Sequence, residues 1–138
     1  MDYKNLTSPC GLDCWNCIMY LSKDNKAIRK MLSKKMNLPE DKVSCPGCRN
    51  SNGTIDFLDM KEPCKVYKCI TRKQIDFCSE CNDFPCENLQ PYAQLADKRP
   101  HNIKAFNLCL IKKMGLEVWA KTKAKSVRKN YFSGKLEL

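Results

Sequence analysis

The chain has 138 residues, a formal net charge of +10, a mean hydropathy of −0.54 and eleven cysteines. This composition excludes a membrane-embedded chain and a low-complexity chain, and the length allows one domain or two very small ones. The net positive charge would be smaller than +10 if the cysteines bind zinc, because a zinc ion with four thiolates carries a net charge of about −2.

The predicted elements begin with a short lead over residues 1–17, which has no apolar signal-peptide core. Apolar residues then recur at helical spacing opposite a lysine-rich face, and this pattern predicts one helix over residues 18–36. Residues 43–63 are rich in Pro, Gly, Asn and Ser and are predicted to be a loop, with a candidate strand over residues 54–58. The lack of a signal-peptide pattern favours a cytoplasmic protein, in a compartment that keeps thiols reduced.

The next predicted element is a short helix over residues 64–74, and a loop with three cysteines follows it. Pro85 suits the first turn of a helix, so a helical turn is predicted over residues 85–96 with Asp83 as its cap. A longer amphipathic helix is predicted to start near residue 101.

Gly115 interrupts this helix, and a second helix is predicted after it, followed by a basic tail that contributes little to the core. Trp15 and Trp119 are predicted to be core anchors. The apolar stripe of the helix near residue 101 holds Ile103, Phe106, Leu110 and Met114. The expected fold is mostly α, a small helical domain with irregular zinc-knuckle loops and little β structure. The expected organisation is one cysteine-rich metal-binding domain over residues 1–120 and a basic C-terminal helix or tail over residues 121–138.

The cysteines are the most informative feature of the sequence, because they are numerous and occur in tight groups. A disulfide framework does not require such grouping, and the cysteine count is odd, so metal ligation is favoured over a disulfide scaffold. Zinc prefers four ligands in a tetrahedron, and a Cys-x-x-Cys turn places two sulfurs on one side of such a centre. The candidate metal ligands are Cys10, Cys14, Cys17, Cys45, Cys48, Cys64, Cys69, Cys78, Cys81 and Cys86.

Eight of these thiols form sequence pairs, which is enough for two zinc ions. Spacing leaves two partitions open, since loop-closure entropy grows only logarithmically with loop length. The preferred partition joins Cys14, Cys17, Cys45 and Cys48 on one ion and Cys64, Cys69, Cys78 and Cys81 on the other. The second partition joins Cys45, Cys48, Cys64 and Cys69 on one ion and Cys14, Cys17, Cys78 and Cys81 on the other. Cys10 and Cys86 are spare in both partitions and are able to replace a member of either set.

Other interpretations of the cysteines carry less weight. The spacing of the first three cysteines is that of a radical-SAM cluster, but Asn16 stands where those enzymes usually have an aromatic residue, and the chain is too small for their barrel. The Cys45–Cys48 segment is similar to a thioredoxin-like pair, but a loop follows it where such a pair opens a helix. Iron–sulfur ligation by the same thiols stays open. Cys109 is predicted to pack in the core as a small hydrophobe.

No catalytic constellation accompanies the thiols. His101 is the only histidine and is predicted to have a surface or capping role at a helix start. The carboxylates form no suggestive pair, and the sequence has no glycine-rich phosphate loop. A closed, all-thiolate ligand set is typical of structural zinc, since catalytic zinc keeps one position open. The sequence therefore favours a non-enzymatic structural zinc module that recognises a macromolecule, with an iron–sulfur or thiol redox protein as the alternative.

The basic charge is concentrated in the C-terminal part of the chain. Residues 101–138 hold nine Lys and Arg against two Glu, a net charge of +7. Such an excess attracts polyanions, but no base-reading motif accompanies it, so any nucleic-acid binding is expected to be weak and independent of sequence. A protein partner is equally open, and no membrane partner is expected.

Three cysteine segments together carry a resemblance to a known family. The residues are CGLDCWNC over 10–17, CPGCR over 45–49, FCSECNDFPCENL over 77–89, and a C-terminal segment, IKKMGLEVW over 111–119. They resemble the cysteine-rich prokaryotic family that carries domain of unknown function 3795, over roughly residues 8–120. The resemblance implies a bacterial or archaeal zinc-binding protein with no assigned activity. Some relatives continue into another Cys-x-x-Cys, where this chain has a tail without cysteine.

Overall fold

A computed structural model describes residues 1–89 and 103–133, and within them the chain is mostly helical, as predicted. The helices are α1 (Tyr3–Leu6), α2 (Ile18–Leu21), α3 (Lys26–Met36), α4 (Lys65–Lys73), α5 (Ile103–Met114), α6 (Leu116–Thr122) and α7 (Ala124–Ser133). Four single 3-10 turns join them, η1 (Cys14–Asn16), η2 (Asp56–Leu58), η3 (Cys78–Glu80) and η4 (Glu87–Leu89). In these described ranges, extended backbone pairs only at an isolated bridge between Thr7 and Asp13.

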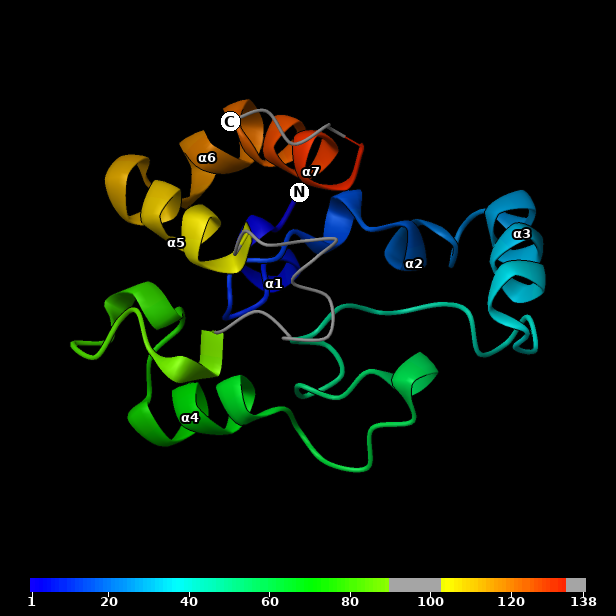
Figure 1. Cartoon of the computed structure of the whole chain (residues 1–138), viewed down its shortest axis with the longest axis horizontal. Coiled ribbons are helices and arrows are strands. Elements are labelled where there is room, and N and C mark those ends of the chain that lie inside the picture. Colours follow the sequence, from blue (N-terminus) through cyan, green and yellow to red (C-terminus); the bar gives the residue numbers. More distant parts are fainter. Residues whose placement is uncertain (90–102, 134–138) are drawn as a thin grey trace.

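The helices form two unequal parts (Figure 1). Helices α5, α6 and α7 contact one another on one side of the molecule, and η3 contacts α5 and lies between it and α4. Helices α2 and α3 form an arm at the far end of the molecule from α5. None of the helices in the described part of the chain is long and apolar enough to cross a membrane.

The predicted helix over residues 18–36 is wrong in one respect, because it is broken into α2 and α3. Asn25 caps α3, and its side chain accepts a hydrogen bond of 3.1 Å from the Ile28 N–H. Ser22 is buried in the break and donates 2.7 Å to the Val43 carbonyl. The apolar spacing continues through the break, so periodicity alone does not reveal it.

The loop over residues 43–63 is confirmed, but the candidate strand within it is wrong. Residues 56–58 instead form the 3-10 turn η2. Helix α4 confirms the prediction over residues 64–74. The predicted turn over residues 85–96 corresponds to η4 at its start, and residues 90–96 lie outside the described residues.

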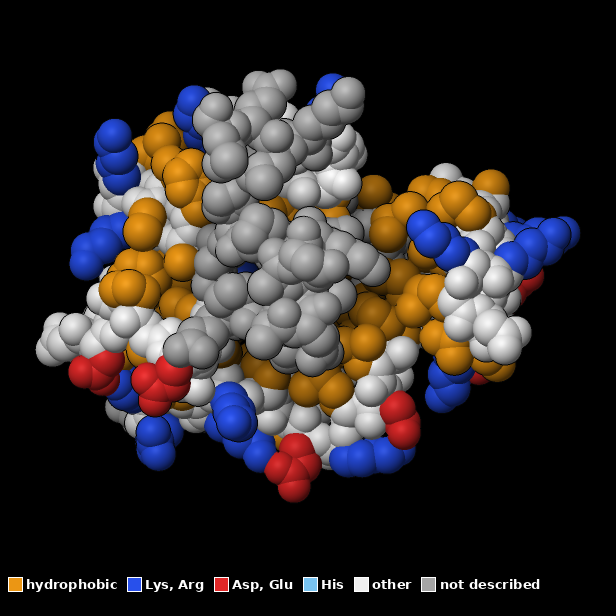
Figure 2. Space-filling view, viewed as in Figure 1, with side chains coloured by type: hydrophobic (Ala, Val, Ile, Leu, Met, Phe, Trp, Pro, Cys, Tyr) orange, Lys and Arg blue, Asp and Glu red, His pale blue; other side chains and the backbone are white. Residues whose placement is uncertain are grey.

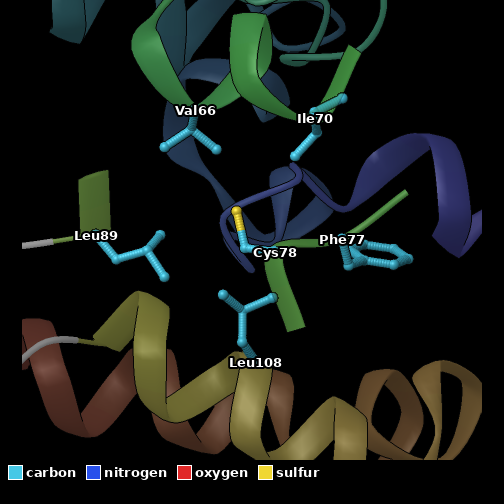
Figure 3. Packing of buried hydrophobic residues seen from close by; sticks show 6 residues of the cluster. All are labelled: Val66, Ile70, Phe77, Cys78, Leu89 and Leu108. Atoms are coloured by element: carbon cyan, nitrogen blue, oxygen red, sulfur yellow. The ribbon is translucent and has the colours of Figure 1, made fainter. Parts of the chain in front are cut away.

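Three clusters of buried side chains hold these elements together. The first joins α4, η3, η4 and α5 through Val66, Ile70, Phe77, Cys78, Leu89 and Leu108 (Figure 3). The second joins α5, α6 and α7 around Trp119, which is fully buried, so its predicted role as a core anchor is confirmed. Trp15 is half-buried against this cluster, with its ring centroid 5.7 Å from that of Trp119. The third lies inside the arm and consists of Met19, Leu32 and Val43.

The predicted core face of α5 is right for three of its four residues and wrong for Phe106: Ile103 is buried, and Leu110 and Met114 pack partly buried against the second cluster. The residues that α5 buries are Ile103, Asn107, Leu108 and Ile111, whereas Phe106 is 54% exposed. Asn107 is drawn inward because its amide donates 2.8 Å to the Gly11 carbonyl and accepts 3.4 Å from the Trp119 indole N–H. Cys109 consequently faces solvent, and the prediction that it packs in the core is wrong. His101 lies outside the described residues.

The basic C-terminal segment adds more to the core than the sequence suggested. Helix α7 contacts both α5 and α6, and Ala124 at its start is buried. Arg128 of α7 forms an ion pair of 2.9 Å with Asp13, whose side chain is fully buried. Residues 124–133 are therefore attached to the N-terminal cysteine segment, while the division of the chain at residue 120 stays a prediction.

Candidate metal centre

The structure brings together four cysteines from two Cys-x-x-Cys segments at the base of the arm. These four thiols, called the knuckle group, are Cys14, Cys17, Cys45 and Cys48. The Cys48 N–H hydrogen-bonds to the Cys14 sulfur, and a Cβ at Gly47 would lie 3.6 Å from that sulfur. This grouping matches one ion of the preferred partition.

Local turn geometry presents the knuckle thiols to one another. Cys14 opens the 3-10 turn η1, and the Cys17 N–H donates 2.8 Å to the Cys14 carbonyl, so their side chains point to the same side. Gly47 has φ +101°, a left-handed conformation that favours glycine, and its N–H reaches the Cys45 sulfur. The Cys45 N–H donates 2.9 Å to the Met19 carbonyl, which holds the second turn against α2.

Three thiols of the knuckle group, those of Cys14, Cys45 and Cys48, have a raised pKa. Burial, with a smaller contribution from the charges of neighbouring thiolates, raises the pKa of Cys14 to about 11 and that of Cys48 to about 12. Burial also raises the pKa of Cys45, which the hydrogen bond from the Gly47 N–H partly offsets. A bound divalent cation would reverse the balance, since a coordinating thiol is deprotonated.

Four other cysteines line a cavity of about 290 Å³ between α4 and the η3–η4 segment. These thiols, called the cavity group, are Cys69, Cys78, Cys81 and Cys86. Burial, with smaller contributions from the charges of Cys10 and of the other three cavity thiols, raises the pKa of Cys78 to about 12. Val66 and Ile70 of α4 supply an apolar wall.

The two remaining candidate ligands lie beside the knuckle group and outside the cavity lining. The charge of Cys10 raises the pKa of Cys14, Cys48 and Cys78, so Cys10 is near both groups. Cys64 caps α4, where its sulfur accepts 3.4 Å from the Tyr67 N–H, and its charge raises the pKa of Cys48.

Metal ligation itself stays a prediction. Within residues 1–89 and 103–133, no group of three or more Cys, His, Asp or Glu side chains is arranged to hold a metal ion. All eleven cysteines belong to these residues, and each of them is a free thiol. The donor chemistry nevertheless fits zinc, because both groups contain four thiols and both have N–H donors directed at sulfur.

The sequence interpretation missed the polar residues that support the thiols. Arg49 donates 2.9 Å to the Thr7 carbonyl and 2.6 Å to the Asp76 carbonyl, so it joins the segment after the knuckle group to the segment before Cys78. Lys73 donates 2.9 Å to the Cys81 sulfur. Helical spacing was a usable signal for Lys73, since it follows Cys69 by one turn, whereas no local signal marks the partners of Arg49.

The fold and the thiol groups define a small, mostly helical, cysteine-rich protein. The family model described as "Protein of unknown function (DUF3795)" matches residues 6–91, well over half of the chain, and the chain belongs to this family. The match confirms the resemblance carried by the cysteine segments, and it ends before the segment over residues 111–119. No curated protein and no solved structure matches the chain.

Proposed function

We propose that the chain is a structural zinc-binding module whose knuckle group holds a zinc ion. The observation that carries the proposal is the contact between two Cys-x-x-Cys turns from distant parts of the sequence, in which the Cys48 N–H bonds the Cys14 sulfur. A tetrahedral site needs two such pairs facing each other. The module would act in the reducing cytoplasm, where thiols stay available for metal.

Zinc at this place has a clear structural use. The arm begins directly after Cys17 and ends directly before Cys45, so one ion would close its base. The arm's own cluster has three buried residues with six partly buried hydrophobic side chains packed against them, Cys17 and Cys45 included, so the core that holds the two helices against the body is small and already involves two of the knuckle thiols. Four thiolate ligands leave no open position on the metal, and this is the arrangement of a structural site.

The test is elemental analysis of reduced protein purified without added metal, together with two matched variants. We expect zinc in the wild-type chain, the loss of one zinc ion in Cys45→Ser, and unchanged zinc in Cys109→Ser, whose thiol is exposed on α5. A wild-type chain without zinc, or one that holds iron and acid-labile sulfide instead, would overturn the proposal.

The proposal extends to recognition of a nucleic acid by the arm. Helix α3 carries five basic residues and no acidic one. Met31 on α3 and Leu21 on α2 are both nearly half exposed. On the face in Figure 2, Lys and Arg side chains surround exposed hydrophobic atoms at this end of the molecule. Contacts with phosphates by such a surface bind without sequence preference and weaken as salt rises.

Charge-reversal variants compare the contribution of α3 to RNA binding with that of α7, the basic helix near the C-terminus. We expect Lys30→Glu with Lys34→Glu to weaken binding of a mixed-sequence RNA at about 50 mM salt by about tenfold or more, since each lost phosphate contact removes a counterion-release contribution. The control is Lys125→Glu with Lys129→Glu, an equal charge change on α7, which we expect to have a smaller effect. Absence of RNA binding by the wild type, or equal losses in both variants, would exclude recognition of nucleic acid by the arm.

A further inference from the structure

We infer that the cavity beside α4 binds a small organic phosphate, a phosphate monoester with an apolar body. The cavity lies between α4 and the η3–η4 segment, and its volume of about 290 Å³ is at the small end of the range for ligand sites. A second, more open hollow of about 240 Å³ adjoins it. The inference goes beyond the proposed function and depends on neither zinc nor RNA.

Apolar side chains form the inner wall of the cavity. Val66 and Ile70 of α4 are buried there, and Ile75 and Phe84 are half-buried in the same lining. Figure 3 shows the Cys78 sulfur directed toward Val66 and Ile70. The cavity group consists of free thiols, which add to the apolar lining because a free cysteine behaves as a small hydrophobe. A ligand therefore gains free energy by burying an apolar body in this space.

The charged side chains that line the cavity itself balance one another. Lys73 Nζ lies 2.6 Å from Asp83 Oδ2, so this ammonium already has a carboxylate partner. The described lining also includes Arg72 and Glu87, which gives two positive and two negative side chains in all. A balanced lining of this kind suits the uncharged body of a ligand and offers little attraction to its anionic group.

The adjoining hollow is basic. Its described lining contains Lys65, Lys68 and Arg72, which share one face of α4 at helical spacing, and no acidic side chain. Lys68 is paired with Glu62. In the part of the chain that the structure describes, neither Lys65 nor Arg72 forms an ion pair. Two uncompensated cations match a phosphate monoester, which carries a charge of about −1.5 to −2 at pH 7.

Three residues line both spaces and connect them: Cys69, Arg72 and Asn88. The planar guanidinium of Arg72 is able to donate two parallel hydrogen bonds to a phosphate, and the exposed amide of Asn88 is a further donor. A phosphate in the hollow beside Arg72 leaves its apolar substituent in the cavity. The two spaces together therefore select a molecule with both parts over a free anion or a free hydrocarbon.

The test uses naphthyl phosphate as the probe, with naphthol and inorganic phosphate as its two halves. We expect calorimetry to show that the joined molecule binds at least about tenfold more tightly than either half, because the entropy of association is lost only once. Naphthoate, with the same rings and a single negative charge, should bind at least about threefold more weakly than naphthyl phosphate. Absence of binding by naphthyl phosphate, or an affinity equal to that of naphthol or naphthoate, would overturn the inference.

A pair of variants tests the cation that both spaces share. Arg72 is exposed, so Arg72→Gln should leave the fold intact, and we expect it to weaken binding of naphthyl phosphate by about tenfold or more. The control is Lys61→Gln, an equal charge change on an exposed residue that lines neither space, with an expected loss below about twofold. Equal losses in the two variants would overturn the inference.

Amide chemical shifts of the wild-type chain locate the bound probe. We expect naphthyl phosphate to shift the signals of α4 and of residues 78–89 and to leave those of α7 unchanged. Shifts confined to α3 or α7 would show binding to a basic surface alone and would overturn the inference. Displacement of the probe by an equimolar amount of mixed-sequence RNA would assign these cations to RNA and would also overturn it.

Discussion

The ion pair between Asp13 and Arg128 predicts a large effect for a single substitution on the basic C-terminal helix. Arg128 Nη1 lies 2.9 Å from Asp13 Oδ1 and 3.3 Å from the Asp13 carbonyl. The Asp13 side chain is fully buried and that of Arg128 is 18% exposed. Among the described residues, Arg128→Ala would therefore leave a buried carboxylate whose remaining side-chain partner is the Asn16 amide, 2.7 Å away.

Removal of one partner from a buried ion pair costs about 3–5 kcal/mol. Arg128 is partly exposed and Asn16 still donates to Asp13, so we expect Arg128→Ala to lower the free energy of unfolding by about 3 kcal/mol, the lower end of this range. The assay is urea unfolding of the zinc-loaded chain followed by far-UV circular dichroism. The control is Lys129→Ala, an exposed neighbour on α7, with an expected loss within about 0.5 kcal/mol.

A double-mutant cycle identifies the cause of the loss. In an Asp13→Asn background the buried group is neutral, so Arg128→Ala should cost at least about 1 kcal/mol less than it does in the wild type. Equal costs in the two backgrounds, or an Arg128→Ala loss no larger than that of Lys129→Ala, would refute the reasoning. If the reasoning holds, truncation before α7 destabilises the cysteine segment over residues 10–17, and loss of RNA binding by a truncated chain is not evidence that the tail binds RNA.

Three further predictions concern the thiols and the tight turn at Gly11. Zinc binding to the knuckle group at pH 7 should release at least three protons, because the pKa of Cys14 is raised to about 11, that of Cys48 to about 12, and that of Cys45 is raised as well. The zinc affinity should therefore rise with pH. Calorimetry in buffers of different ionisation enthalpy measures the number of protons released, and release of one proton or fewer would contradict the prediction. Gly11→Ala should lower the free energy of unfolding by about 1–3 kcal/mol or more, since Gly11 has φ +86° and an added Cβ would lie 3.0 Å from the Lys104 carbonyl oxygen. Gly115→Ala should lower it less, because Gly115, at φ +81°, has open space around it. Urea unfolding of both variants checks this order. Cys109→Ser should change stability by no more than about 0.5 kcal/mol, because this thiol faces solvent, and a loss above about 1 kcal/mol would show that it is packed.

Local patterns in the sequence were enough to predict the elements whose register is set by their own residues. Helix α4 and the break at Gly115 follow from apolar spacing and from glycine. The break between α2 and α3 was missed because Asn25 and Ser22 are polar residues whose capping and buried hydrogen bonds do not alter the apolar periodicity. The burial of Asn107 and the exposure of Phe106 on α5 were missed because Asn107, a polar residue, is held in the core by a carbonyl and an indole from other segments.

In the candidate site, contacts within one cysteine turn were predictable from the sequence, whereas contacts between turns that are far apart in the sequence were not. Each Cys-x-x-Cys turn was predicted from its own spacing, because two thiols three residues apart must lie close together. Which turns meet depends on the burial of Val66, Ile70 and Leu89 and on the hydrogen bonds of Arg49, which join segments far apart in the sequence. The pair of Asp13 and Arg128 spans almost the whole chain, and no pattern within either segment indicates it.

The two ends of the arm lie side by side, so the length of the arm can change without moving the segments that it joins. The Cys45 N–H donates to the Met19 carbonyl, so the chain leaves the body and returns to it at adjacent points. A segment with adjacent ends can be lengthened, shortened or exchanged at small entropic cost, because closure depends only weakly on the number of residues enclosed. The exposed positions of the arm, between Cys17 and Cys45, are thus where length and sequence can vary while the buried contacts of Ser22 and Leu32 and the cysteine segments on either side keep their geometry.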